Sequence, residues 1–257
     1  FFDVGTTQVT VTATDAAGNT SQCTFDVVVN DTEDPVANCP STQTASNDPG
    51  ECGAIVSFSV PSPADNCAGA TASSNLASGS FFDVGTTQVI VTATDAVGNT
   101  NQCTFDVVVN DTEKPVANCP ADITVNAEAG QPTADVSFSI PSPSDNCTGT
   151  TAQADIASGA AFPLGQATVT VTATDARGNT GNCIFSVTVN DAQAPTANCP
   201  ENITVDNAAG QCGANVSFTV PEPTDNAPGA TASARPVPGT FFDVGTTEVT
   251  VTATDVS

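Results

Sequence analysis

Three short acidic motifs recur along the chain, and they contain the side chains best suited to bind a metal ion. They are the NDTEDP type of linker, an Asp-Asn pair in the sequence PADNC or its variants, and the turn DAVGN or its variants. Carboxylate and amide oxygens gathered from separate loops are the ligands that Ca²⁺ takes in proteins. The candidate ligands are Asp31, Glu33, Asp34, Asp65, Asn66, Asp95, Asn99, Asp111, Glu113, Asp145, Asn146, Asp175, Asn179, Asp191, Asp225 and Asp255.

These residue types also have an ordinary role in turns, where Asp and Asn hydrogen-bond their own backbone. Each motif alone is therefore explained by a turn, and only convergence of all three at one pole of a module favours calcium. The linker becomes less acidic along the chain, from Glu33 and Asp34 through Glu113 to Gln193. A calcium site at each module junction is thus predicted to be strongest at the first junction and weakest at the third.

Ten cysteines offer a second kind of chemistry, the formation of disulfide bonds. The absence of His and of any CxxC pair argues against a zinc site. One cysteine precedes a proline at the start of each module, and another begins each last strand. Both positions should face inward near the same pole, which predicts the bonds Cys39–Cys103 and Cys119–Cys183 and an oxidising compartment.

The remaining cysteines occupy two positions that recur imperfectly. One position reads Cys52, Pro132 and Cys212, and the other reads Cys67, Cys147 and Ala227. Pairing within a module would join opposite ends of a strand, which is too far for a disulfide. Pairing each first position with the second position of the next module gives Cys52–Cys147, and it matches the joint loss at Pro132 and Ala227. Free thiols or bonds to neighbouring chains are the alternative.

The motifs are carried by a repeat with a period of 80 residues. The sequence FFDVGTTQVTVTATD at Phe1 returns with small changes at Phe81, Ala161 and Phe241. This spacing predicts the end of a preceding module (1–30), two whole modules (31–110 and 111–190) and one truncated before its last strand (191–257). The chain is expected to be a fragment of a longer array.

Strands with alternating polar and apolar residues must position these motifs. Val89, Val91 and Ala93 share one face of a predicted strand, and Cys103, Phe105, Val107 and Val109 share a face of the next. Short strands of this kind, separated by Gly, Pro and Asn turns, predict an all-β, immunoglobulin-like antiparallel sandwich. Apolar Ile123–Val125 and Ile203–Val205 predict an opening strand in their modules, whereas Gln43 and Ala45 predict a weaker one.

The ordered motifs resemble the hyalin repeat (HYR) family. The resemblance is carried by D-x-x-x-P-x-x-x-CP, V-S-F-x-x-P-x-x-x-DN, FDVGTTQVIVTATDAVGN and C-T-F-D-V-V-V, and it covers essentially the whole chain. It implies immunoglobulin-related modules in extracellular proteins connected with adhesion, and no catalytic residues. The near-uniform array is similar to bacterial surface proteins, and the linkers are similar to the calcium linkers of cadherins and bacterial adhesins.

The net charge and the residue types limit the classes of function that the chain is expected to have. A net charge of −25 would repel nucleic acid and anionic membranes, and no segment is suited to membrane insertion. No arrangement of nucleophile and base predicts an enzyme. We expect a structural stalk or extracellular filament whose partners are neighbouring modules or copies of the same chain. The alternative is an adhesion module that binds a cell-surface or matrix ligand.

Overall fold

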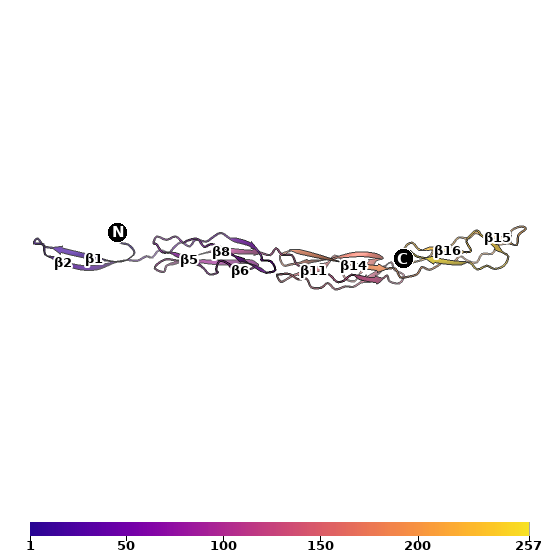
Figure 1. The fold of residues 1–257 in the computed structure, drawn as a ribbon, viewed down its shortest axis with the longest axis horizontal. Coiled ribbons are helices and arrows are strands. Elements are labelled where there is room, and N and C mark those ends of the chain that lie inside the picture. The colour runs from indigo at the N-terminus through magenta and orange to yellow at the C-terminus, as the bar shows by residue number, and fades with distance from the viewer. Residues whose placement is uncertain (257) are drawn as a thin grey trace. The chain divides into compact units, whose positions relative to one another are not determined.

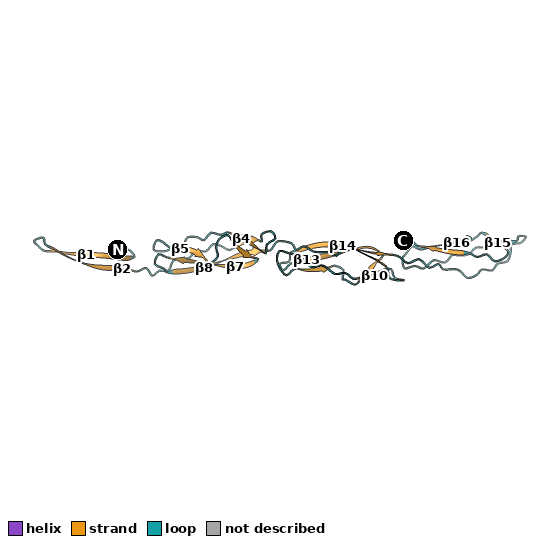
Figure 2. Cartoon of the chain, turned by 60° about the horizontal axis from the view of Figure 1, so that its bottom comes forward, coloured by secondary structure: helices purple, strands orange, loops and turns teal. Residues whose placement is uncertain are grey.

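The computed structural model describes residues 1–256, and every regular element in them is a β-strand (Figure 2). None of these residues forms a helix able to cross a membrane. The all-β prediction is therefore confirmed. Two compact units divide the chain: the first contains Phe1–Glu113 with Asp145–Thr148, and the second contains Lys114–Ser144 with the residues from Gly149 onward.

The first unit begins with a hairpin and continues with one sandwich module (Figure 1). One sheet of the module has the order β3-β8-β7-β5, in which β3 and β8 are parallel and the other neighbours antiparallel. The second sheet pairs β4 with β6. The strands are β1 (Gly5–Thr14), β2 (Thr20–Val29), β3 (Gln43–Ser46), β4 (Gly53–Val56), β5 (Thr71–Ser74), β6 (Ser80–Asp83), β7 (Gly85–Thr94) and β8 (Thr100–Asn110).

The core of this module lies between its two sheets. Alternate residues of β7 and β8 point inward, so that Val89, Val91 and Val107 are fully buried. Phe58 packs edge-on against Phe105 with ring centroids 5.0 Å apart, which is a favourable aromatic geometry. The period of two residues thus produces the buried face that it predicts.

The second unit contains a similar module and a further one that has fewer strands. Its larger sheet has the order β11-β13-β14-β9, and β10 pairs with β12. In the described residues of the further module, the paired strands are β15–β17 and β16–β18. The strands are β9 (Ile123–Asn126), β10 (Thr133–Val136), β11 (Thr151–Ala154), β12 (Ala160–Pro163), β13 (Gly165–Thr174), β14 (Thr180–Asn190), β15 (Gly213–Asn215), β16 (Thr231–Arg235), β17 (Phe241–Asp243) and β18 (Thr250–Thr254).

The expectation for the opening strands is wrong in two places. Gln43–Ser46 forms a strand as long as Ile123–Asn126, whereas Ile203–Val205 forms none. The reason is the pairing partner, because β3 pairs with β8 and β9 pairs with β14. Among residues 1–256, no strand equivalent to β14 pairs with the backbone of residues 203–205.

Candidate functional site

In the first unit, three aspartates from separate segments come together. One carboxylate oxygen from each of Asp31, Asp65 and Asp95 lies within 4.8 Å of the others. Asp31 belongs to the linker that follows β2, and Asp95 belongs to the turn between β7 and β8. An isolated antiparallel bridge between Val36 and Ala64, with N···O distances of 2.7 and 3.1 Å, holds the linker beside the loop of Asp65.

Asp95 is fixed by the backbone of its own turn. Its Oδ1 accepts hydrogen bonds from the N–H groups of Val97, Gly98 and Asn99 at 3.0, 2.6 and 2.8 Å. Its Oδ2 accepts one from Nδ2 of Asn99 at 2.8 Å. Burial acts to raise the pKa of Asp95, but the hydrogen bonds from Asn99, Gly98 and Val97 outweigh it and lower the pKa. The carboxylate is therefore ionised at neutral pH.

Asp65 presents an oxygen that the protein does not satisfy. Its Oδ2 accepts a hydrogen bond from the N–H of Cys67 at 3.2 Å, whereas its buried Oδ1 has no hydrogen-bond partner. The neighbouring Cys67 thiol has its pKa raised to about 11 by its hydrogen bond to Asp31, by burial and by the charges of the three aspartates. A buried acceptor without a partner is costly, and a cation would satisfy it. The residues therefore fit a bound Ca²⁺.

The second unit contains an equivalent group, in which one oxygen from each of Asp191, Asp225 and Asp255 lies within 4.8 Å of the others. A bridge between Thr196 and Thr224, with N···O distances of 2.8 and 3.0 Å, positions the linker beside the loop. Both carboxylate oxygens of Asp225, together with Oδ1 of Asn226, are buried without hydrogen-bond partners. The donor set thus fits a cation at least as well as the first group.

The candidate ligands of the middle motifs are divided between the two units. Asp111 and Asp145 belong to the first unit, where their carboxylate oxygens lie within 4.8 Å of each other. Asp175 belongs to the second unit and accepts hydrogen bonds from the N–H groups of Arg177 and Asn179, both at 2.8 Å. Burial opposes ionisation of Asp175, but the Asn179 hydrogen bonds outweigh it and lower the pKa.

The other acidic linker residues lie outside these groups among the described residues. Oε2 of Glu113 accepts a hydrogen bond from the N–H of Gly50 at 2.8 Å, and Oε1 of Gln193 accepts the same bond from Gly130 at 2.7 Å. Asn99 uses its amide to contact Asp95 and the carbonyl of Glu33. Asp34 and Asn66 are exposed. The loss of acidic linker residues therefore leaves each group of aspartates intact.

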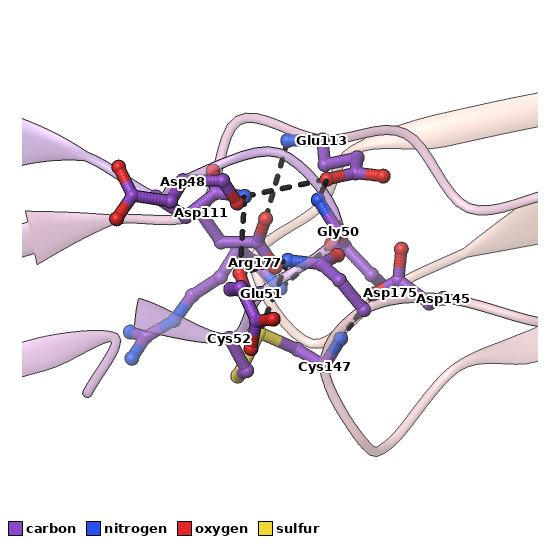
Figure 3. Close-up of a disulfide and its surroundings, with 12 residues drawn as sticks. Asp48, Gly50, Glu51, Cys52, Asp111, Glu113, Asp145, Cys147, Asp175 and Arg177 are labelled. Atoms are coloured by element: carbon purple, nitrogen blue, oxygen red, sulfur yellow. Dashed lines mark hydrogen bonds between the residues drawn. A yellow bond between two sulfur atoms is a disulfide. The ribbon is translucent and has the colours of Figure 1, made fainter. Parts of the chain in front are cut away.

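The part of the chain that the structure describes contains three disulfide bonds. Cys39 is bonded to Cys103, and Cys119 to Cys183, each across a sequence separation of 64 residues. Cys52 is bonded to Cys147, and the close-up shows this bond close to Glu51 (Figure 3). Free thiols are found at Cys23, Cys67, Cys199 and Cys212.

Two hydrogen bonds of the Asp-Asn loops were not predicted from sequence. Nδ2 of Asn146 donates to the carbonyl of Glu51 at 2.9 Å, and Nδ2 of Asn226 donates to the carbonyl of Gln131 at 3.2 Å. Sequence motifs identified the Asp-Asn pairs as oxygen ligands, and nothing in them indicated amide donation to a turn some 95 residues away. The Asn recurs next to the Cys147 or Ala227 position, and this recurrence is the sequence signal that could have linked the Asp-Asn loop to the turn it contacts.

The chain is similar to proteins from animals. It is 36% identical over 270 residues to hyalin of Strongylocentrotus purpuratus, covering 100% of this chain and 22% of that protein. It is 35% identical over 268 residues to hyalin of Lytechinus variegatus, covering 99% of this chain and 51% of that protein. The chain therefore spans only about half, or less, of these relatives. The solved protocadherin gammaB4 extracellular domain is 16% identical, covers 98% of this chain and 52% of that one, and gives a TM-score of 0.38.

These matches do not support the expected bacterial source, because the relatives are animal proteins. Disulfides persist in oxidising environments, and the chain is an extracellular or cell-surface protein. The HYR domain model matches residues 1–29, 30–109, 110–189 and 190–257, in succession and without a gap. The chain therefore belongs to the HYR domain family.

Proposed function

We propose that this chain is a structural segment of an extracellular stalk or filament, in which bound Ca²⁺ stiffens the loops and linkers around each group of aspartates. The observation that carries the proposal is the pair of groups Asp31–Asp65–Asp95 and Asp191–Asp225–Asp255, each with at least one buried carboxylate oxygen that lacks a hydrogen-bond partner. A divalent cation supplies the positive charge that these groups require.

The composition of the chain supports a cation from solution. The whole sequence contains only three Lys and Arg residues against 28 Asp and Glu residues, so basic side chains are too few to neutralise the groups. Repulsion between gathered carboxylates opposes the compact state. A hard divalent cation with flexible coordination relieves this repulsion and prefers oxygen donors such as these.

The repeated architecture supports a structural role rather than a catalytic one. The same strands, turns and aspartates recur in successive modules, and in repeat proteins each repeat contacts mainly its neighbours. Neighbouring modules or further copies of the chain are the proposed partners. The relatives named hyalin belong to an adhesion-type family, and a cell-surface or matrix ligand is the alternative partner.

Calcium titration of the metal-free protein tests the proposal. At a calcium concentration about 100-fold above Kd, binding should stabilise a module by about 2.7 kcal/mol and raise its Tm by at least about 5 °C. Asp65→Asn and Asp225→Asn should each remove part of this increase. Asp106→Asn, which neutralises an aspartate outside these groups, is the matched control and should retain it. An unchanged Tm together with no calcium binding by calorimetry would contradict the proposal.

A further inference from the structure

A groove with apolar side chains in its walls runs through the described residues 191–256. Its volume is about 1040 Å³, and its lining includes Cys199, Ile203, Val205, Phe218, Phe242 and Val251. In residues 111–190 the equivalent side chains are covered by β14, whose Phe185 packs edge-on against Phe138 with ring centroids 5.0 Å apart. The groove therefore lies where a strand like β14 would pack.

The hairpin of β1 and β2 contains a strand of the matching sequence, and its apolar face is uncovered. β2 reads TSQCTFDVVV, and β8, which fills the core of its own module, reads TNQCTFDVVVN. Phe25 in β2 is 52% exposed, whereas the equivalent Phe105 in β8 is 5% exposed. β2 pairs with β1 at one edge, and among the described residues no strand pairs with its other edge. A strand with an open edge and an exposed apolar face is suited to join another sheet.

The groove and the hairpin each carry a free cysteine where a module with all its strands has a disulfide. Cys199 lines the groove and Cys23 lies in β2, and both are exposed. The equivalent residues Cys119 and Cys183 form a disulfide, with Cα atoms 5.9 Å apart. A strand that docks in the groove as β14 docks in its own module would therefore bring Cys23 to Cys199.

We propose that copies of this chain join in series, with β2 of one copy inserted into the groove of residues 191–256 of another and held there by a Cys23–Cys199 disulfide. Each copy has one such strand and one such groove, so the same contact repeats from copy to copy and builds a filament. This inference rests on the structural part of the proposed function, and it names the contact between copies.

The register of the inserted strand follows from β14. Val187 in β14 lies opposite Ile123 of its parallel neighbour, so Val27 should lie opposite Ile203. At its antiparallel edge, β2 leaves β1 and pairs with residues 245–254 of the other copy. That segment reads GTTEVTVTAT and differs from the β1 sequence GTTQVTVTAT at Glu248, so the exchange keeps nearly all side-chain pairs. Exchange of an identical element between copies costs little, because the contacts given up are formed again.

Electrophoresis without reductant, after oxidation, tests this contact. Cys67→Ser with Cys212→Ser provides the background, because it leaves Cys23 and Cys199 as the free thiols among the described residues. Oxidised glutathione supplies the oxidant: it takes up two electrons and two protons from the two thiols and becomes two molecules of reduced glutathione, while a bond forms between the Sγ atoms. The expected result is a ladder of covalent multimers, and Cys23→Ser in the same background should give none.

Peptide mapping of a mixture of isotopically labelled and unlabelled chains shows which copies are joined. Peptides of Cys23 and Cys199 should be linked between labelled and unlabelled copies. Phe25→Ser, which removes the ring expected in the groove, should slow formation of this bond about tenfold. The matched control is Val28→Ser in the same strand, because Val28 alternates with the inward-facing residues and is 59% exposed. Its rate should be unchanged.

Three results would overturn the inference: monomers in which both thiols remain alkylatable, a Cys23–Cys199 bond found only within single copies, or equal rates for Phe25→Ser and Val28→Ser. None of these results alters the response of Tm to calcium, so each leaves the calcium role of the aspartate groups intact. A ladder of multimers in a chain that binds no calcium would overturn the calcium role and leave the contact between copies standing.

Discussion

Residues 111–190 and residues 191–257 have closely similar sequences, but they bury their apolar side chains to very different extents. In the first region, Phe162, Val169 and Val171 are at most 2% exposed. The equivalent residues Phe242, Val249 and Val251 are only half-buried. Ala234 is the one buried apolar side chain in the described part of the second region.

The strand β14 accounts for this difference. It supplies Phe185, Val187 and Val189 to the core and pairs with both β13 and β9. The described residues 191–256 contain no equivalent strand, so their apolar residues lack this third partner and residues 203–205 are unpaired. An apolar pattern therefore predicts which residues are able to form a buried face, and the partner strand decides whether they do.

The largest effect on stability is expected when Phe162→Ala is compared with Phe242→Ala. Removal of the fully buried Phe162 ring should cost about 4 kcal/mol, because it leaves a cavity that the module cannot fill. Loss of the half-buried Phe242 ring should cost less than about half of this. Urea unfolding followed by hydrogen exchange in each module measures both values. Equal losses of stability in the two variants would show that Phe242 is buried as completely as Phe162.

A smaller effect is expected at the opening strands, for Ile123→Ala against Ile203→Ala. Ile123 is partly buried against the core and lies opposite Val187, so its truncation should destabilise the module by about 2 kcal/mol. Ile203 is 50% exposed and should contribute within about 0.5 kcal/mol. The measurement is the urea midpoint of each variant, and a matching loss at Ile203 would indicate that residues 203–205 are paired in solution.

The smallest expected effect concerns pH. The lowered pKa of Asp175 means that its ionised form stabilises the fold, and that this stabilisation is present above the ordinary pKa of about 4 and is lost as pH falls through the lower folded value. Asp175→Asn should therefore lower Tm at pH 7 and have less effect near pH 2. Thermal unfolding with a chelator present checks this. A Tm difference independent of pH would argue against a role for the charge.

Sequence alone predicted the faces of the strands well and the contacts of single side chains poorly. Val89, Val107 and Phe105 are buried as the alternation indicates, because that pattern depends only on neighbours along the chain. The position of Glu113 depends on a turn at Gly50, which lies 63 residues away and leaves no trace in the local motif. The pairing of Cys52 with Cys147 could be predicted from sequence, because the two cysteine positions are replaced jointly, by Pro132 and Ala227.

The Cys39–Cys103 disulfide has a consequence for a chain under tension. Cys39 precedes β3 and Cys103 lies in β8, so a pull on the two ends of the module passes from Cys39 through the disulfide to Cys103 and along β8. The residues between the two cysteines, which include β3 and would span roughly 200 Å when extended, stay out of the load path. The parallel hydrogen bonds between β3 and β8 therefore do not carry the load, and the module yields under force without lengthening by this loop.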